Sequence, residues 1–165
     1  MVIVEPATVY PEVEFQNALV SLVNALLRAE KRPFALLERF GLDVAVFLDG
    51  SPTTVRLLEV KAFNAQRMGG VGFGNGRGVG PQVDLLLFGE SSLCLFDSVV
   101  RWAYADATLP PGASRYGLFT CEAAKAAAMG SITRGKQNNL SVSALRPGLV
   151  GWKEFCGQVK GFLLA

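Results

Sequence analysis

The chain has 165 residues, half of them apolar and 18% charged, which fits one folded domain with a sizeable core. Sixteen Lys and Arg against fourteen Asp and Glu leave a net charge of +2, too small by itself to indicate a polyanionic partner. The chain contains no histidine. This excludes Ser-His-Asp and Cys-His nucleophile systems and zinc sites with histidine ligands.

The three cysteines, Cys94, Cys121 and Cys156, are far apart and form no CxxC pair. A disulfide framework or cysteine-based zinc site is therefore not expected, and the composition favours a reducing cytoplasm. Mean hydropathy is +0.32, but polar residues interrupt the longest apolar helical pattern, residues 15–27. We predict no membrane span, and the N-terminal residues lack the positive charge that begins a signal peptide.

The first predicted element is a helix over 11–31, because Pro11 suits a first helical turn and apolar residues then recur at helical spacing. Counting 100° per residue places Glu12 inside the apolar stripe and Glu14 on the polar side. A carboxylate on a buried face needs a partner, so Glu12 is the candidate functional acid and Glu14 the reserve. Residues 34–40 are expected to add a further helical turn or two.

A β-hairpin is predicted over 42–63. Residues 42–49 alternate as a strand, Asp49-Gly50-Ser51-Pro52 is a turn signal, and residues 53–63 form the second strand. With a connection of about five residues, Asp43 falls opposite Glu59. Strand parity then points Glu59 and Lys61 to one face and Val60 to the other.

The remaining pattern predicts a mixed α/β sheet flanked by helices, in one domain spanning 1–165. Glycine recurs seven times in 69–80, which is expected to be an irregular, mobile loop. Strands are expected at 83–88 (with a short helix over 81–88 as the alternative), 93–96, 99–104 and 116–121. A helix is expected at 122–129, a basic loop at 134–139 and an amphipathic helix at 152–164.

The chemistry is expected at the hairpin, where two carboxylates and a lysine share one place. Opposed side chains on paired strands lie about 5 Å apart at Cβ, so Asp43 and Glu59 need a proton, a lysine or a cation between them. Carboxylate oxygens with open positions suit Mg²⁺, which would polarise a phosphodiester and acidify a bound water. Lys61 would orient or deprotonate that water, or stabilise charge on the phosphate. Glu12, at the helix start, could approach the metal.

These residues resemble the PD-(D/E)XK nuclease superfamily, particularly its small archaeal members similar to Holliday-junction resolvases. The resemblance covers residues 11–63: a helix with an acid, the strand beginning Gly41-Leu42-Asp43, and Glu59-Val60-Lys61 on its partner. It implies a restriction-endonuclease-like core and metal-dependent cleavage of DNA. Asp43 and Glu59 would be metal ligands with the backbone carbonyl of Val60, Lys61 the catalytic lysine, and Glu12 or Glu14 the helix acid. Leu42 stands where the family often has proline.

The implied function is a Mg²⁺-dependent DNA endonuclease, with Mn²⁺ able to substitute and RNA left open as a substrate. Further expected contacts to nucleic acid are Arg67, Arg77, Arg134, Lys136 and Asn138, with Gln82 as a reserve site residue. A homodimer is expected from the high apolarity of a small domain and from duplex substrates with two strands to cut.

Three other interpretations stand beside the nuclease. The acids and the lysine would also be expected on a solvated sheet face, where they would form cross-strand ion pairs. A catalytically silent nucleic-acid-binding or scaffold protein could use the same fold. Residues 130–137 approach a P-loop, but Gln137 replaces the Ser or Thr that would hold Mg²⁺. A nucleotide-binding protein using this segment is the third alternative.

Overall fold

The computed structural model describes the chain except residues 1, 41, 52, 65–69, 75–96 and 134. Within that part, five strands form a main sheet in the order β1-β2-β3-β5-β6, and β4 pairs with β7 in a second, small sheet. The strands are β1 Phe34–Phe40, β2 Leu42–Leu48, β3 Val55–Phe63, β4 Gly70–Gly74, β5 Val100–Asp106, β6 Tyr116–Phe119 and β7 Asn138–Ser141; the helices are α1 Glu12–Ala29, α4 Cys121–Ala126, α5 Val142–Leu145 and α6 Trp152–Leu164, with a 3-10 turn over Arg146–Gly148. Strands β3 and β5 run parallel, while the other neighbours in the main sheet are antiparallel. The protein is thus an α/β protein with a mixed sheet flanked by helices.

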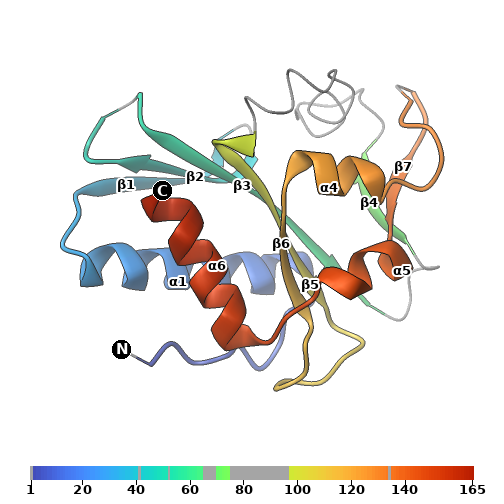
Figure 1. Cartoon of the computed structure of the whole chain (residues 1–165), viewed down its shortest axis with the longest axis horizontal. Helices are drawn as coiled ribbons and strands as arrows, with labels where there is room; N and C mark the ends of the chain where they lie inside the picture. Colours follow the sequence, from blue (N-terminus) through green and yellow to red (C-terminus); the bar gives the residue numbers. More distant parts are fainter. Residues whose placement is uncertain (1, 41, 52, 65–69, 75–96, 134) are drawn as a thin grey trace.

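Helices α1 and α6 cover one face of the main sheet (Figure 1). The apolar stripe of α1 and the buried side of α6 pack on the inward residues of the strands, here Val44, Val46, Leu58, Val60 and Ala62. None of the helices in the described residues has both the length and the apolar character that a bilayer crossing requires.

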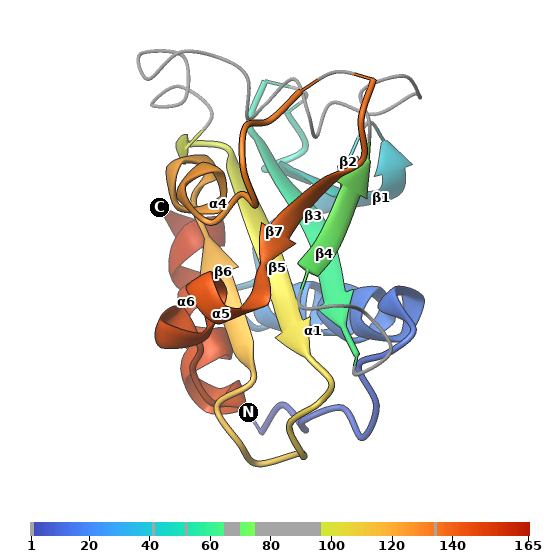
Figure 2. The same cartoon turned by 90° about the vertical axis from the view of Figure 1, so that its right-hand side faces the viewer.

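The opposite face of the main sheet is covered by α4, α5 and the β4–β7 sheet, which stand in front of β5 in Figure 2. Trp102 and Tyr104 of β5 are buried on this face against residues of α4 and β7. The pairing of β3 with β5 sets Glu59 beside Trp102 and Lys61 beside Tyr104. Two charged side chains of β3 therefore lie on a face that is otherwise an apolar core.

The strongest periodic patterns predict the elements well. The helix expected over 11–31 is confirmed as α1, and the hairpin expected over 42–63 is confirmed as β2 and β3, paired antiparallel. The turn between them places Asp49 and Gly50 at φ 55° and 65°, which suits its Asp-Gly sequence. The expected helix at 152–164 coincides with α6, and the strand expected at 99–104 is β5.

Several predictions are wrong. Residues 34–40 form a strand, β1, rather than helical turns, because they pair along the whole length of β2. The glycine-rich loop contains a strand, β4, where Gly70–Gly74 pairs with β7. The strand expected over 116–121 ends at Phe119, since Thr120 caps α4 through its side chain. The loop expected over 134–139 gives Asn138 and Asn139 to β7. The elements expected at 81–88 and 93–96 lie outside the described residues.

Two of the glycines in β4 lie where a side chain would collide with a neighbouring segment. A Cβ on Gly70 would lie 2.8 Å from Met129 Sδ, and one on Gly72 would lie 2.7 Å from Gln137 Nε2. These residues therefore allow the β4 backbone to approach the segment that leads into β7. Their role in this strand is close packing rather than the loop mobility that the glycine content predicted.

Candidate active site

The candidate site forms where β2 begins and β3 ends. The two strands pair as far as Val44 opposite Leu58, and one further step in the same register sets Asp43 opposite Glu59. Asp43 is half-buried, and its Oδ2 accepts a hydrogen bond from the backbone N–H of Val60 at 2.7 Å. The carboxylate of β2 is thereby fixed against the middle residue of Glu59-Val60-Lys61.

Glu59 and Lys61 form a buried ion pair on β3. Glu59 is 0% exposed and Lys61 6% exposed, and Lys61 Nζ donates to Glu59 Oε1 at 2.6 Å and to the carbonyl of Val60 at 3.0 Å. The ammonium also lies 5.9 Å from the centroid of the Trp102 ring, within cation–π range. A carboxylate, a carbonyl and a ring thus compensate the buried ammonium, and the pair is enclosed by core on this side.

Glu12 joins this pair from the first turn of α1. Its Oε1 lies 4.0 Å from Lys61 Nζ, and its side chain is 42% exposed. Glu12 and half-buried Asp43 therefore provide the side of the cluster that solvent reaches, whereas Glu59 is closed off. Three separate elements, α1, β2 and β3, thus form one charged cluster, which consists of Glu12, Asp43, Glu59 and Lys61.

The cluster keeps Lys61 protonated. Burial alone would lower the pKa of Lys61, but the charges of Glu59 and Glu12, the hydrogen bond to Glu59 and the charge of Asp43 outweigh it and raise this pKa above its ordinary value. A proton held this firmly does not suit a general base at neutral pH. Of the roles predicted for Lys61, stabilising negative charge and orienting water fit the geometry.

Gln16 is a site residue that the sequence analysis missed. It is 9% exposed on α1, and its Nε2 donates to the backbone carbonyl of Asp43 at 3.3 Å and to Glu38 Oε1 at 3.4 Å. Gln16 lies four residues after Glu12, so the two polar side chains share one face of the helix. This four-residue spacing beside the apolar stripe is the feature of the sequence that could have identified Gln16.

The other predicted site residues are placed apart from this cluster or are not described. Glu14 is exposed, so Glu12 rather than Glu14 is the helix acid near Lys61. Lys136 is exposed in the segment before β7. Arg67, Arg77, Gln82 and Arg134 lie outside the described residues.

The prediction that Asn138 contacts nucleic acid is not supported by its position. Asn138 is 6% exposed. Its side chain accepts from the N–H of Thr133 and donates to the carbonyls of Thr133 and Lys136. The amide thus closes the loop before β7, and this structural role explains its presence.

The P-loop-like segment 130–137 has the wrong neighbours for a nucleotide site. Helix α4 and a single bridge residue, Ala128, precede it, and strand β7 follows it. A P-loop connects a strand to a helix, whose N-terminus binds the phosphates. Lys136 therefore lacks the backbone arrangement that would make it a phosphate-binding lysine.

The two cysteines that the structure describes are poor nucleophiles. Burial raises the pKa of Cys121 to about 11 and that of Cys156 to about 11. Both side chains remain thiols at neutral pH, and the thiolate is the reactive form. The charged cluster is a better candidate for chemistry than either thiol.

The oxygen donors of the cluster suit a hard cation. Among the described residues, no three acidic or cysteine side chains are grouped closely enough to hold an ion by themselves. Mg²⁺, however, usually takes one or two protein carboxylates and fills its other positions with water and substrate phosphate. The ammonium of Lys61 already lies among Glu59 Oε1, the Val60 carbonyl and Glu12 Oε1, so this place stabilises positive charge.

Comparison of the chain with models of protein families, with curated proteins and with solved structures finds no match. A functional assignment therefore depends on the chemistry of the charged cluster.

Proposed function

We propose that the protein is a Mg²⁺-dependent DNA endonuclease with a restriction-endonuclease-like core. The observation that supports this most strongly is the convergence of Glu12, Asp43, Glu59 and Lys61 at one end of the β2–β3 hairpin. These residues come from the helix and the two strands that carry the resemblance to the PD-(D/E)XK nucleases. A solvated sheet face, the simplest alternative, would not bury Glu59 and Lys61.

Asp43, Glu59 and the Val60 carbonyl are the groups that would hold the metal, and the Lys61 ammonium would have to leave Glu59 Oε1 and that carbonyl for the metal to bind. Mg²⁺ bound there supplies Lewis-acid polarisation of the phosphodiester and of the attacking water. Lys61, kept protonated, stabilises the negative charge that develops on the phosphate. Glu12, at the exposed side of the cluster, is positioned to accept a hydrogen bond from the attacking water. No step needs imidazole, which agrees with a chain that has no histidine.

The test is cleavage of supercoiled, branched and single-stranded DNA with Mg²⁺ or Mn²⁺. We expect cutting of at least one substrate with either metal and none in EDTA, because the carboxylates alone cannot polarise the phosphodiester. Binding without cutting under every metal condition would contradict the nuclease and support the catalytically silent binding protein. Cleavage that persists in EDTA would contradict the metal-dependent mechanism. An RNA strand in the same series decides whether the substrate is DNA alone.

Gln16 is predicted to position Asp43 for this reaction. Replacing Gln16 by Ala removes the amide that contacts the Asp43 carbonyl and Glu38, so we expect cleavage to fall by about 10–100-fold with little loss of DNA binding. The matched control is Asn17→Ala, which changes the next, exposed residue of the same helix. Equal activity in both variants, measured at saturating DNA, would remove Gln16 from the site.

The homodimer remains a prediction. Light scattering at working concentration measures it directly, and particles of 17.6 kDa alone would contradict it. The nucleotide-binding alternative is not proposed, because α4 and β7 stand in the wrong order around residues 130–137. ATP binding by the unaltered protein that is lost in Lys136→Ala would support the nucleotide-binding alternative.

A further inference from the structure

A cavity of about 490 Å³ lies at the end of the main sheet where the parallel strands β3 and β5 finish. Its walls are the segment before α1 (residues 7–10), Asn64 directly after β3, the loop after β5 (residues 107–111) and Arg115. Figure 2 shows the N-terminal segment and this loop side by side at the lower end of the molecule. The volume is in the range of small-ligand pockets.

Two walls of the cavity are close in sequence to the candidate active site. Tyr10 on one wall stands two residues before Glu12, and Asn64 on the other stands three residues after Lys61. At about 3.3 Å per strand residue, Asn64 is on the order of 10 Å from Lys61 along β3. A group bound here and a phosphodiester at the charged cluster would therefore be neighbours in one substrate.

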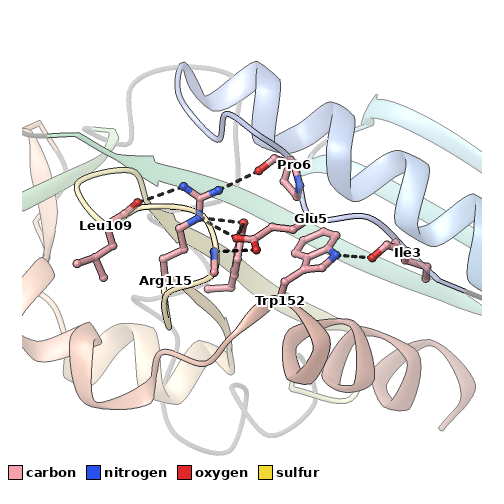
Figure 3. Close-up of polar contacts among 8 residues, drawn as sticks. Ile3, Glu5, Pro6, Leu109, Arg115 and Trp152 are labelled. Atoms are coloured by element: carbon pink, nitrogen blue, oxygen red, sulfur yellow. Dashed lines mark hydrogen bonds and ion pairs between the residues drawn. The ribbon is translucent and has the colours of Figure 1, made fainter.

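Hydrogen bonds of Arg115 and Glu5, together called the clip, join the two walls (Figure 3). Arg115 donates from Nη1 to the carbonyl of Leu109 at 3.1 Å and from Nη2 to the carbonyl of Pro6 at 2.9 Å. Glu5 accepts from the N–H of Gly112 at 2.9 Å. Because the bonds from Arg115 to Pro6 and from Gly112 to Glu5 cross between the loop after β5 and the N-terminal segment, the cavity is formed before any ligand arrives.

The lining is suited to an uncharged, planar ligand with polar edges. Tyr10 contributes an aromatic ring, Pro110 and Pro111 contribute flat apolar surface, and Asn64 contributes an amide. The one charged side chain among the described lining residues, Arg115, is 2% exposed and uses its N–H groups in the clip. The Oδ1 of Asn64 is buried and accepts no hydrogen bond from any described residue, so the amide on this wall is not fully satisfied within the described part of the chain.

We propose that this cavity binds an unpaired nucleobase next to the scissile phosphodiester. Aromatic surface stacks on bases of any sequence, and an amide can pair with a base edge. A paired base cannot enter, so the enzyme selects DNA in which the nucleotide beside the cut is single-stranded or flipped out. This inference rests on the proposed nuclease function, since only the nearby cluster makes the ligand a nucleotide.

The test measures binding in the absence of metal, so that no substrate is cut. An oligonucleotide carrying 2-aminopurine is offered as a single strand and as a full duplex, and fluorescence reports stacking of the base. We expect preference for the single strand, a loss of about 10-fold in that preference for Tyr10→Ala, and retention of it in Tyr10→Phe, which keeps the ring. Asn64→Ala should also weaken single-strand binding, with exposed Asn17→Ala as its control.

Two outcomes would overturn the inference. One is wild-type protein that binds single strand and duplex equally; the other is a preference unchanged in both Tyr10→Ala and Asn64→Ala. The separate cleavage assay distinguishes this failure from failure of the nuclease proposal. If the protein cuts DNA but both variants keep the single-strand preference, only the base-pocket inference is wrong. If 2-aminopurine stacks but no DNA is cut, only the nuclease proposal is wrong.

Discussion

Replacing Asp43 by Asn should reduce metal-dependent DNA cleavage by at least about 100-fold. The substitution keeps the shape of the side chain, and an amide oxygen can still accept the hydrogen bond from Val60 N–H that Asp43 Oδ2 accepts at 2.7 Å. The fold should therefore be preserved while the negative charge that the proposed Mg²⁺ site needs is lost. Initial cleavage rates across a Mg²⁺ series measure the effect, with thermal unfolding as the check on folding.

The matched control is Asp49→Asn, the same chemical change in the turn after β2. Asp49 is exposed and pairs with Arg32 at 2.7 Å, away from the charged cluster. It should cleave DNA like the unaltered protein. Equal rates for the two variants would show that the carboxylate of Asp43 has no part in catalysis, and would leave binding without chemistry as the better account of the cluster.

The parts of this site that the sequence predicted are those set by local periodicity. Counting 100° per residue chose Glu12 over Glu14, and Glu12 is the one that lies 4.0 Å from Lys61. Alternation along β2 and β3 and a short turn predicted the hairpin, whose register follows from these two features. Helical angle and strand parity are properties of a few consecutive residues, so they can be read before the fold is known.

The parts that the sequence missed depend on distant partners. The residues of β1 have no helical or strand signature strong enough to decide between the two, and pairing with β2 makes them a strand. The glycine content predicted disorder at Gly70–Gly74, whereas β7, more than 60 residues later, makes it a strand. The cavity is likewise assembled from separate segments of the chain, so no local sequence pattern predicts it.

Replacing Arg115 by Ala should cost about 3 kcal/mol of unfolding free energy, because it breaks an ion pair whose arginine is buried and leaves Glu5 and Tyr116 without that donor. Arg115 Nε lies 3.3 Å from Glu5 Oε1 and donates to the phenol oxygen of Tyr116 at 2.9 Å. The same Glu5 oxygen accepts from that phenol at 2.7 Å. Burial and the hydrogen bond to Glu5 raise the pKa of Tyr116, which therefore stays a donor across the ordinary pH range.

Denaturant unfolding of Arg115→Ala against Arg32→Ala separates a buried clip from an exposed ion pair. Arg32 makes two short hydrogen bonds to Asp49, yet both side chains reach solvent, so its loss should leave the unfolding free energy close to that of the unaltered protein. Similar stability in the two variants would mean that the N-terminal segment is held mainly by Trp152, which donates from Nε1 to the carbonyl of Ile3 at 2.9 Å (Figure 3). If the clip is the main restraint, Arg115→Ala should also loosen the walls of the cavity and weaken single-strand binding. The bond from Arg115 to the Pro6 carbonyl, which joins the N-terminal segment to the loop after β5, would be lost.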